Sequence, residues 1–418
     1  MRTSRFRITA SVDNPLNYHG RAPRGKYEIK PTKPLKTKED LSLAYSPGVV
    51  QPSLEIKRNE NYVDNYTNKA NSVAVITNGT AVLGLGNMGV SASKPVMEGK
   101  VVLFKEFGYI NSVDLEVDTE SVSDFVNAVS LLGKTWGGIN LEGICAPDCF
   151  LIESRLQHLL DIPVFHDDQH GTAIVVLAGL MNAFYLTNRN MRTTKVVICG
   201  AGAAGIACGE LLLEYGISKE NLIMVDRSGV INQNRKDYIN GWKDKFRQVT
   251  DKNTLEEAMD GADVFVGVSC SEVLNPGMLR SMNDHPIVFA LSNPTLEINP
   301  KKAKVTRADI LLATGRSDYP NQINNVLCFP FIFRGALDVK ARTVNTAMKI
   351  AAAKTIARLG RNCIEFGEDA FVPDIFDDRL LPEVSYAVAE AAILSNNTVE
   401  TFSFLRDYKN QLHAISDK

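Results

Sequence analysis

Short runs of apolar residues, many of them β-branched, alternate with longer helical segments along most of this chain of 418 residues. Five such runs lie after residue 195, at 196–198, 222–225, 262–269, 287–291 and 310–313. Turn residues flank each run, which is the pattern of buried parallel strands. Strands of this kind that alternate with helices predict a doubly wound α/β sheet. Alanine-rich periodic segments at 339–359 and 382–394 predict a closing helical layer.

The first half shows the same alternation. It predicts strands at 73–83 and 100–107, an amphipathic helix at 121–132, and a strand, a helix and a strand between 138 and 165. Residues 12–40 are rich in Pro, Gly and Lys and are interpreted as an extended N-terminal segment. Because the chain is too long for one compact core, we expect two domains. These are an N-terminal α/β domain at 1–164 and a Rossmann-type domain with C-terminal helices at 165–418.

The strongest local signal is a βαβ pattern between Lys195 and Asp226. An apolar strand leads into Gly200-x-Gly202-x-x-Gly205, and a helix and a second strand ending at Asp226 follow. The glycines allow a tight turn and a close approach of a pyrophosphate, and the helix N-terminus offers free N–H donors. The predicted cofactor-binding set is Gly200, Ala201, Gly202, Ala203, Ala204, Gly205, Asp226 and Arg227. Asp226 suits the ribose of NAD, whereas Arg227 suits the 2′-phosphate of NADP, so both cofactors stay open.

A second glycine set, Gly84-x-Gly86-x-x-Gly89, also follows an apolar strand. Pro95 interrupts the segment after it, and the next strand-like run begins near Lys100. That leaves too little chain for a βαβ crossover. We therefore interpret this set as a tight glycine turn.

Composition narrows the class of protein. The chain is 44% hydrophobic and 22% charged, as ordinary globular proteins are, and its net charge of -2 gives no general attraction to nucleic acid or an anionic membrane. No apolar run reaches the length of a membrane span. The seven cysteines are scattered without zinc-ligand spacing, which favours reduced thiols in a cytoplasmic enzyme. The Arg- and Ser-rich opening lacks a secretory apolar region; we favour a short leader over an organellar transit peptide.

Two residues of the first half are candidates for acid–base chemistry. Lys100 closes the segment KPVMEGK and opens an apolar run, so its amine is expected near a strand end, where desolvation lowers a lysine pKa as a base requires. Tyr45 lies at the lip of a Pro-Gly turn. A tyrosine that packs its ring and exposes its hydroxyl is the plainer interpretation there.

Polar residues also follow several predicted strands. Glu142 follows one strand, and Asp167 and Asp168 follow the next, before a helix predicted at 172–186. The aspartates either cap that helix or belong to a carboxylate cluster, whose oxygen ligands would select Mg²⁺ or Mn²⁺. Asn293 follows another strand end, where doubly wound sheets bind ligands.

Together these segments resemble the short, bacterial-type malic enzyme family. The resemblance rests on LAYSPGV, KPVMEGK, INLEGICAPDCF, PVFHDDQHGTA, GAGAAG, LSNPT and ATGRSDYPNQINNVLCFPFIFRGALD, which occur in the family's order. It implies oxidative decarboxylation of (S)-malate to pyruvate and CO₂, with NAD or NADP and with Mg²⁺ or Mn²⁺. It also implies a homodimer. Matched by motif, Lys100 falls at the family's general base and contacts substrate, Tyr45 falls at the general acid, and Asn293 and Asn325 fall on substrate-binding asparagines.

One position departs from the family pattern. The resemblance puts metal ligands at Glu142 and Asp168, with Asp167 beside them as a catalytic residue. The family usually has Asp directly after the glutamate, where this chain has Gly143. One carboxylate is therefore missing, so we predict weakened metal affinity and a preference for Mn²⁺. Water, Asp167 or Asp148 would fill the position.

Two functions of other classes stay open. One is a regulatory protein that kept cofactor binding and lost turnover through Gly143; the presence of both Tyr45 and Lys100 opposes it. The other is a hydroxy-acid or amino-acid dehydrogenase that releases no CO₂. Such an enzyme needs no carboxylate cluster at residues 142–168.

Overall fold

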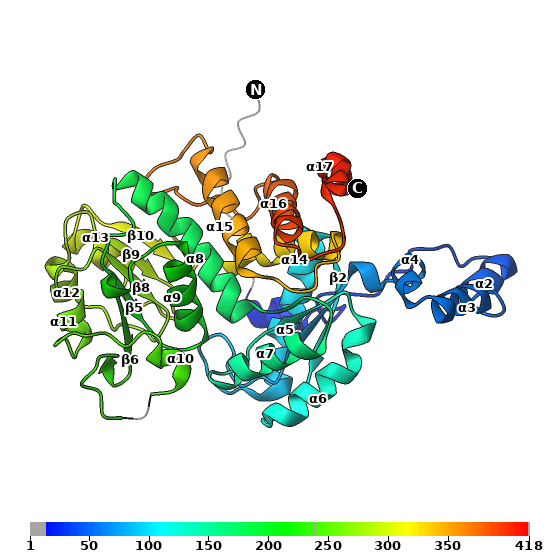
Figure 1. Cartoon of the computed structure of the whole chain (residues 1–418), viewed down its shortest axis with the longest axis horizontal. Helices are drawn as coiled ribbons and strands as arrows, with labels where there is room; N and C mark the ends of the chain where they lie inside the picture. Colours follow the sequence, from blue (N-terminus) through cyan, green and yellow to red (C-terminus); the bar gives the residue numbers. More distant parts are fainter. Residues whose placement is uncertain (1–13, 238, 417–418) are drawn as a thin grey trace.

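Two parallel sheets, side by side in Figure 1, organise the computed structural model of this chain, which describes residues 14–237 and 239–416. The predicted leader falls on residues 1–13 and lies outside the described residues. Within the described ranges, no helix is long and apolar enough to cross a membrane. All seven cysteines are free thiols, as predicted.

The first sheet has the strand order β2-β1-β3-β4, with all neighbours parallel. Its strands are β1 (Ser72–Thr77), β2 (Asn111–Glu116), β3 (Gly138–Leu141) and β4 (Val164–His166). Its helices are α5 (Gly89–Gly108), α6 (Val122–Leu132), η3 (Gly133–Thr135) and α7 (Asp148–Leu159). Every residue of β1 and β3 is buried, which explains their continuous apolar runs.

The strand predicted at 100–107 is wrong, because these residues belong to α5. The buried positions Met97, Val101, Phe104 and Gly108 recur at helical spacing and turn one face of α5 inwards. The second strand, β2, comes only after this helix. A crossover does connect β1 to β2, so the argument that the chain is too short for one was also wrong.

The tight turn predicted from the first glycine set is confirmed. Gly84, Gly86 and Gly89 have φ angles of 73°, 81° and 72°, in the left-handed region that favours glycine. They join β1 to α5 over a loop at residues 78–88.

The second sheet has the order β10-β9-β8-β5-β6-β7, and only β7 is antiparallel. Its strands are β5 (Val196–Cys199), β6 (Leu222–Asp226), β7 (Gly229–Val230), β8 (Val264–Gly267), β9 (Ile287–Ala290) and β10 (Leu311–Thr314). Its helices are α9 (Ala203–Tyr215), η4 (Lys219–Asn221), α10 (Gly241–Asp244), α11 (Leu255–Met259), α12 (Pro276–Ser281) and α13 (Pro300–Thr306). The strand order reverses between β5 and β8, as in doubly wound dinucleotide-binding folds, which confirms the α/β prediction.

The closing helical layer is confirmed and lies over both sheets in Figure 1. It consists of α8 (Asp167–Leu186), η5 (Asn325–Leu327), α14 (Phe329–Asp338), α15 (Thr346–Arg361), α16 (Leu380–Leu394) and α17 (Phe402–Ser416). The helix predicted at 339–359 begins later, because Lys340 has a φ of 51° and interrupts the helix between α14 and α15. Buried Asn182 of α8 donates to the carbonyl oxygens of Ala357 and Phe371, which fixes α8 to the C-terminal segments.

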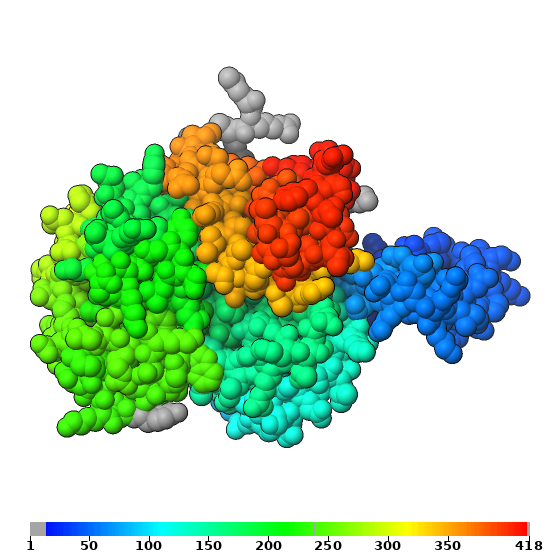
Figure 2. All heavy atoms as spheres, in the orientation of Figure 1, coloured from blue at the N-terminus to red at the C-terminus, as the bar shows by residue number. Residues whose placement is uncertain are grey.

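The N-terminal segment is more helical than predicted. It contains α1 (Pro15–Gly20), α2 (Lys38–Ala44), α3 (Val50–Arg58), η1 (Glu60–Tyr62), α4 (Val63–Tyr66) and η2 (Lys69–Asn71). Residues 38–66, which we call the arm, project from the body of the molecule as the blue lobe in Figures 1 and 2. The capping box of Thr37 and Asp40 begins its first helix.

Candidate active site

A buried lysine lies among carboxylates at the end of the first sheet. Nζ of Lys100 donates to Oδ2 of Asp167 at 2.5 Å and lies 3.2 Å from Oε2 of Glu142. It also lies over the ring of Phe329, 4.1 Å from the centroid. Lys100, Glu142 and Asp167 are all buried, and charged groups persist at such depth only when they are paired.

Parallel strands bring the carboxylates together. Glu142 directly follows β3, and Asp167 and Asp168 directly follow its neighbour β4. Because both strands point the same way, their carboxyl ends meet at one edge of the sheet. Lys100 reaches this edge from the buried face of α5.

The aspartates do not cap the following helix through their side chains. They form its first turn, and Oδ2 of Asp168 instead accepts the N–H of Gly143 at 2.7 Å. Nε2 of His166 lies 3.3 Å from the same oxygen. The capping interpretation is therefore wrong. The backbone N–H of Gly143, just after β3, instead fixes the side chain of Asp168 at the edge of the cluster.

The second sheet also contributes to the cluster. Asn325, which opens η5 after β10, donates from Nδ2 to Oδ2 of Asp167 at 2.5 Å. The other oxygen, Oδ1 of Asp167, is buried and has no hydrogen-bond partner among the described residues. A Cβ on Gly171 would lie 1.9 Å from it, so glycine is required beside this carboxylate. A free buried acceptor of this kind marks a position where a ligand, a water or a cation binds.

The charges around Lys100 change the expected chemistry. Burial alone would lower the pKa of Lys100, but Asp167 and Glu142 outweigh burial and raise its pKa above the ordinary value. The expectation that the pKa of Lys100 is lowered was therefore wrong when only the side chains of the protein surround it. Burial raises the pKa of Glu142 to about 8, and burial also raises the pKa of Asp167. Lys100 keeps its proton until the negative charge around it is offset.

The donor set fits a divalent cation only in part. Glu142 and Asp168 offer carboxylate oxygens, which suit Mg²⁺ or Mn²⁺. Across residues 14–237 and 239–416, however, no group of three or more His, Cys, Asp or Glu side chains is arranged as a metal site. Two carboxylates suffice where substrate and waters supply the remaining ligands, a common arrangement for Mg²⁺.

The second glycine set opens α9 at the carboxyl end of β5. Gly200 has a φ of 120°, and a Cβ on Gly205 would lie 1.7 Å from the carbonyl oxygen of Gly200. No heavy atom outside the immediate chain lies within 4 Å of a Cβ placed on Gly202, so the backbone there stays open. The residues predicted to bind pyrophosphate thus surround the amino end of α9.

Asp226 does not offer a free carboxylate to a ribose. Nη1 of Arg235 lies 3.0 Å from it, Nζ of Lys243 lies 2.7 Å from it, and the N–H of Ser228 donates to it. Burial alone would raise the pKa of Asp226, but Lys243 and Arg235 outweigh burial and lower it. Arg227, the predicted phosphate contact, is exposed at the next position. Arg235 and Lys243 were not predicted, because nothing in the motif marks two basic residues in the polar segment after it.

Two predicted site residues lie outside the cluster. Tyr45 directly follows α2 and is 71% exposed, and α2 lies well away from the two sheets in Figure 1. Asn293 follows β9 and is exposed; a Cβ on Gly84 would lie 2.2 Å from its carbonyl oxygen. The structure therefore brings Lys100 and Asn325 together with the carboxylates, leaves Asn293 at the glycine turn, and does not bring Tyr45 to the cluster.

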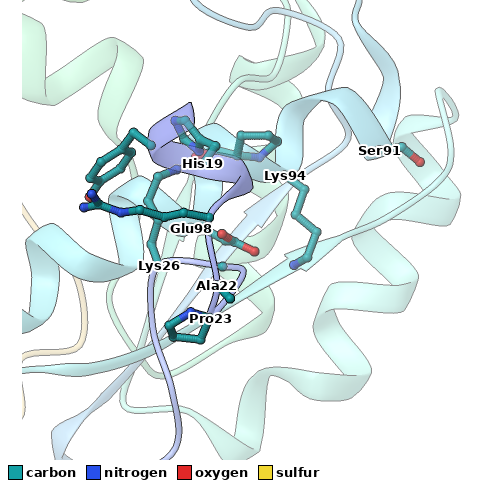
Figure 3. Close-up of a pocket in the computed structure, with 11 residues that line it drawn as sticks. His19, Ala22, Pro23, Lys26, Ser91, Lys94 and Glu98 are labelled. Atoms are coloured by element: carbon teal, nitrogen blue, oxygen red, sulfur yellow. Dashed lines mark hydrogen bonds between the residues drawn. The ribbon is translucent and has the colours of Figure 1, made fainter. Parts of the chain in front are cut away.

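Lys94, the first lysine of KPVMEGK, lies outside the lysine–carboxylate cluster. Nζ of Lys94 donates to Oδ2 of Asp114 at 2.7 Å, and the hydroxyl of Tyr27 donates to the other oxygen at 2.6 Å. Figure 3 shows Lys94 at a pocket of about 370 Å³ that Lys26 and Glu98 also line, between the α1 segment and α5. Lys94 thus fixes the N-terminal segment to the first sheet.

These features define an α/β protein with a dinucleotide-binding sheet and a second parallel sheet whose strand ends carry a lysine–carboxylate cluster. Residues 169–395 match the family described as "Malic enzyme, NAD binding domain", and residues 24–123 match "Malic enzyme, N-terminal domain". The chain belongs to the malic enzyme family. The nucleotide-binding match contains Gly200 to Gly205, the set chosen from the sequence, and not Gly84 to Gly89.

The similarity to known malic enzymes extends over the whole chain. The chain is 51% identical to the NADP-dependent malic enzyme of Rhizobium meliloti (strain 1021), over 100% of this chain and 56% of the relative. It is also 51% identical to the NADP-dependent malic enzyme of Halomonas elongata, over 90% of this chain and 92% of that relative. A crystal structure of malic enzyme from Pyrococcus horikoshii Ot3 matches with a TM-score of 0.88 and 39% identity, over 96% of this chain and 95% of that chain. The chain spans about half the length of several curated relatives.

Proposed function

We propose that this chain oxidises and decarboxylates (S)-malate to pyruvate and CO₂ and reduces NADP. One observation carries the proposal: the buried amine of Lys100 lies between Glu142 and Asp167, where the first sheet meets Asn325 from the second. Membership of the malic enzyme family supports the same reaction.

The side chains divide the work in this proposal. Asn325 and Asn293 orient malate, and Asp167 holds the amine of Lys100 in place. In its neutral form, which a cation that offsets the surrounding carboxylates would favour, Lys100 takes the proton of the C2 hydroxyl as hydride leaves for the nicotinamide. Glu142 and Asp168 would hold a Mg²⁺ or Mn²⁺ ion, which would supply Lewis acidity toward the C2 oxygen when bound. After CO₂ leaves, a proton returns to C3; the family motif assigns this step to Tyr45, which lies outside the cluster in the single chain.

The basic pair beside Asp226 supports NADP over NAD. Arg235 and Lys243 gather at the end of β6, where the ribose of a dinucleotide lies in this fold. Two cations suit the 2′-phosphate of NADP, and Asp226 orients them. The same carboxylate is already engaged and is a poor acceptor for the free ribose hydroxyls of NAD.

We also propose that the chain acts as a homodimer in the cytoplasm, where its seven free thiols would stay reduced. The division into domains after residue 164 stays a prediction.

One set of assays tests the reaction and the cofactor together. The wild-type chain is supplied with malate and Mn²⁺, and reduction of NADP and NAD is followed with release of CO₂. We expect coupled CO₂ release and a lower KM for NADP. In Lys243→Ala, the KM for NADP should rise about tenfold, as expected for loss of a charged hydrogen bond, while the KM for NAD stays unchanged.

Lys245→Ala is the matched control, because Lys245 is also basic, lies two residues further on, and pairs with Glu210 instead. It should leave both KM values unchanged. Reduced nucleotide without CO₂ would refute decarboxylation, and an equal rise of both KM values in Lys243→Ala would refute the phosphate site.

A further inference from the structure

A buried glutamate of α7 lies beside the turn that carries the aspartates of the cluster. Glu153 is 6% exposed and lies in none of the motifs on which the family resemblance rests. Burial alone would raise the pKa of its carboxyl group, but the charge and the hydrogen bond of His170 outweigh burial and lower the pKa to about 2. Glu153 is therefore an anion at neutral pH, yet the proposed reaction gives it no role.

Both carboxylate oxygens of Glu153 bind the junction between β4 and α8. Oε1 accepts the backbone N–H of His166 at 2.9 Å. Oε2 accepts a hydrogen bond from Nε2 of Gln169 at 3.0 Å and lies 2.9 Å from Nε2 of His170. The three groups come from the last residue of the strand and from the first turn of the helix. One side chain thus fixes the chain before and after the two aspartates of the site.

The contacts of Glu153 reach the proposed metal ligand Asp168 in one further step. Asp168 lies within the junction, where its Oδ2 accepts the N–H of Gly143 at 2.7 Å. The same oxygen lies 3.3 Å from Nε2 of His166, and Nδ1 of that ring lies 3.0 Å from Nε2 of Gln169. The direction of the Asp168 carboxylate therefore depends on the position of a turn that Glu153 fixes.

We propose that Glu153 is a positioning residue for the metal site, whose two oxygens hold the junction of β4 and α8 so that the carboxylate of Asp168 is directed toward the cation. Glu153 acts through the junction and is not itself a ligand. Groups that orient a metal ligand in this way commonly govern metal affinity. The inference rests on the proposed metal-dependent reaction, which assigns Asp168 as a ligand, and it extends the site to α7.

The variant Glu153→Gln keeps the size of this side chain and removes its charge. A glutamine has one oxygen and one NH₂ group, so it can accept hydrogen bonds at only one of the two positions. Its NH₂ group would then face either the N–H of His166 or the side chains of Gln169 and His170. Because two donors that face each other in a buried site are unfavourable, the junction must shift to separate them.

Calorimetric titration with Mn²⁺ in the absence of malate tests the inference. The wild type should bind Mn²⁺, and Glu153→Gln should bind it about tenfold more weakly, as expected for loss of a group that orients a metal ligand. Glu297→Gln is the matched control, because Glu297 is also buried and its oxygens accept the N–H groups of Ser269 and Ser292. This control should lose stability in urea while its Mn²⁺ affinity stays that of the wild type.

Hydrogen exchange in metal-free protein reports the position of Asp168 without any cation. The carboxylate of Asp168 protects the N–H of Gly143, so a peptide that covers residues 139–147 should exchange faster in Glu153→Gln than in the wild type. The same peptide should be unchanged in Glu297→Gln. If Glu153→Gln does not fold, Gln169→Met removes one donor to the carboxylate and should weaken Mn²⁺ binding about threefold.

The possible failures are distinct. Equal Mn²⁺ affinities of Glu153→Gln and the wild type, or an equal loss of affinity in Glu297→Gln, would overturn the role of Glu153 and leave the proposed reaction intact. Unchanged exchange of the peptide at 139–147 would overturn it as well. A wild-type protein that binds no Mn²⁺ and still releases CO₂ from malate would remove the metal from the proposed function, and the role of Glu153 with it.

Discussion

At the scale of single residues, Gly143 shows how the backbone is arranged at the position where the family usually has an aspartate. Its N–H donates to Asp168, and its φ of 63° lies in the left-handed region. A Cβ there would approach Oγ1 of Thr77 at 3.2 Å, which is close but leaves room for a small adjustment. Asp and Asn tolerate this conformation better than other residues with a side chain. An aspartate at this position would therefore be strained but not excluded.

Restoring that carboxylate should strengthen metal binding. In Gly143→Asp, Mn²⁺ titrated in a calorimeter without malate should bind about tenfold more tightly, because a third anionic ligand joins Glu142 and Asp168. Gly143→Asn has the same size and backbone preference without the charge, so it should bind Mn²⁺ nearly as weakly as the wild type. Equal dissociation constants for all three proteins would contradict the prediction that Gly143 weakens the site.

The sequence predicted which residues belong to the site, but it could not predict how their charges shift one another's pKa values. Strand ends and family motifs pointed to Lys100, Asp167 and Asn325, and the structure brings these together. The raised pKa of Lys100 depends on distances to two carboxylates from other elements, which no local pattern contains. The same holds for Lys243, whose meeting with Asp226 follows from how a polar loop folds back.

At the scale of elements, the wrong prediction of a strand at 100–107 arose because a short apolar run does not distinguish a strand from a helix. Four consecutive apolar residues at 101–104 suit a buried strand or a buried helix, and periodicity over so few positions does not separate them. The helical answer comes from packing, since Lys100 and Phe104 both face the site end of the first sheet from α5. The five parallel strands of the second sheet were predicted to within a few residues, because they stand isolated between turn residues, whereas the short antiparallel β7 was not predicted.

Beneath the site, four phenylalanines join α5, β4 and α14. The ring centroid of Phe333 lies 5.3 Å from that of Phe104 and 5.8 Å from that of Phe165, and Phe104 lies 4.8 Å from Phe329. Phe333 is fully buried, so Phe333→Ala should lower the free energy of unfolding by about 3–5 kcal/mol in urea titration. Phe376→Ala, at an exposed ring, should change it by about 0.5 kcal/mol or less. Similar losses in both variants would show that this cluster does not hold α14 in place.

At the scale of the whole molecule, the site belongs to no single domain or element. Lys100 comes from α5 and Glu142 follows β3 of the first sheet, Asn325 comes from η5 after the second sheet, and α8 begins at the site and extends over the dinucleotide-binding half. The arm is the exception to this integration, because it packs so little against its own chain. Sequence periodicity could not reveal this, since an apolar helix face looks the same whether its partner is the same chain or another.

If a second copy of the chain covers the arm, each chain folds fully only when it associates, so the stability of the protein depends on its concentration. Each tenfold dilution then removes about 1.4 kcal/mol from the stability of the dimer, so Tm should fall steadily as protein concentration falls. Leu43→Asp, at an arm leucine that is 76% exposed, should give a monomer whose lower Tm does not depend on concentration. Leu394→Asp makes the same change at a leucine 66% exposed on α16 and should behave like the wild type. A wild-type Tm that is constant over three decades of concentration, with a monomeric mass in solution, would mean that the arm stays uncovered and that each chain must work alone.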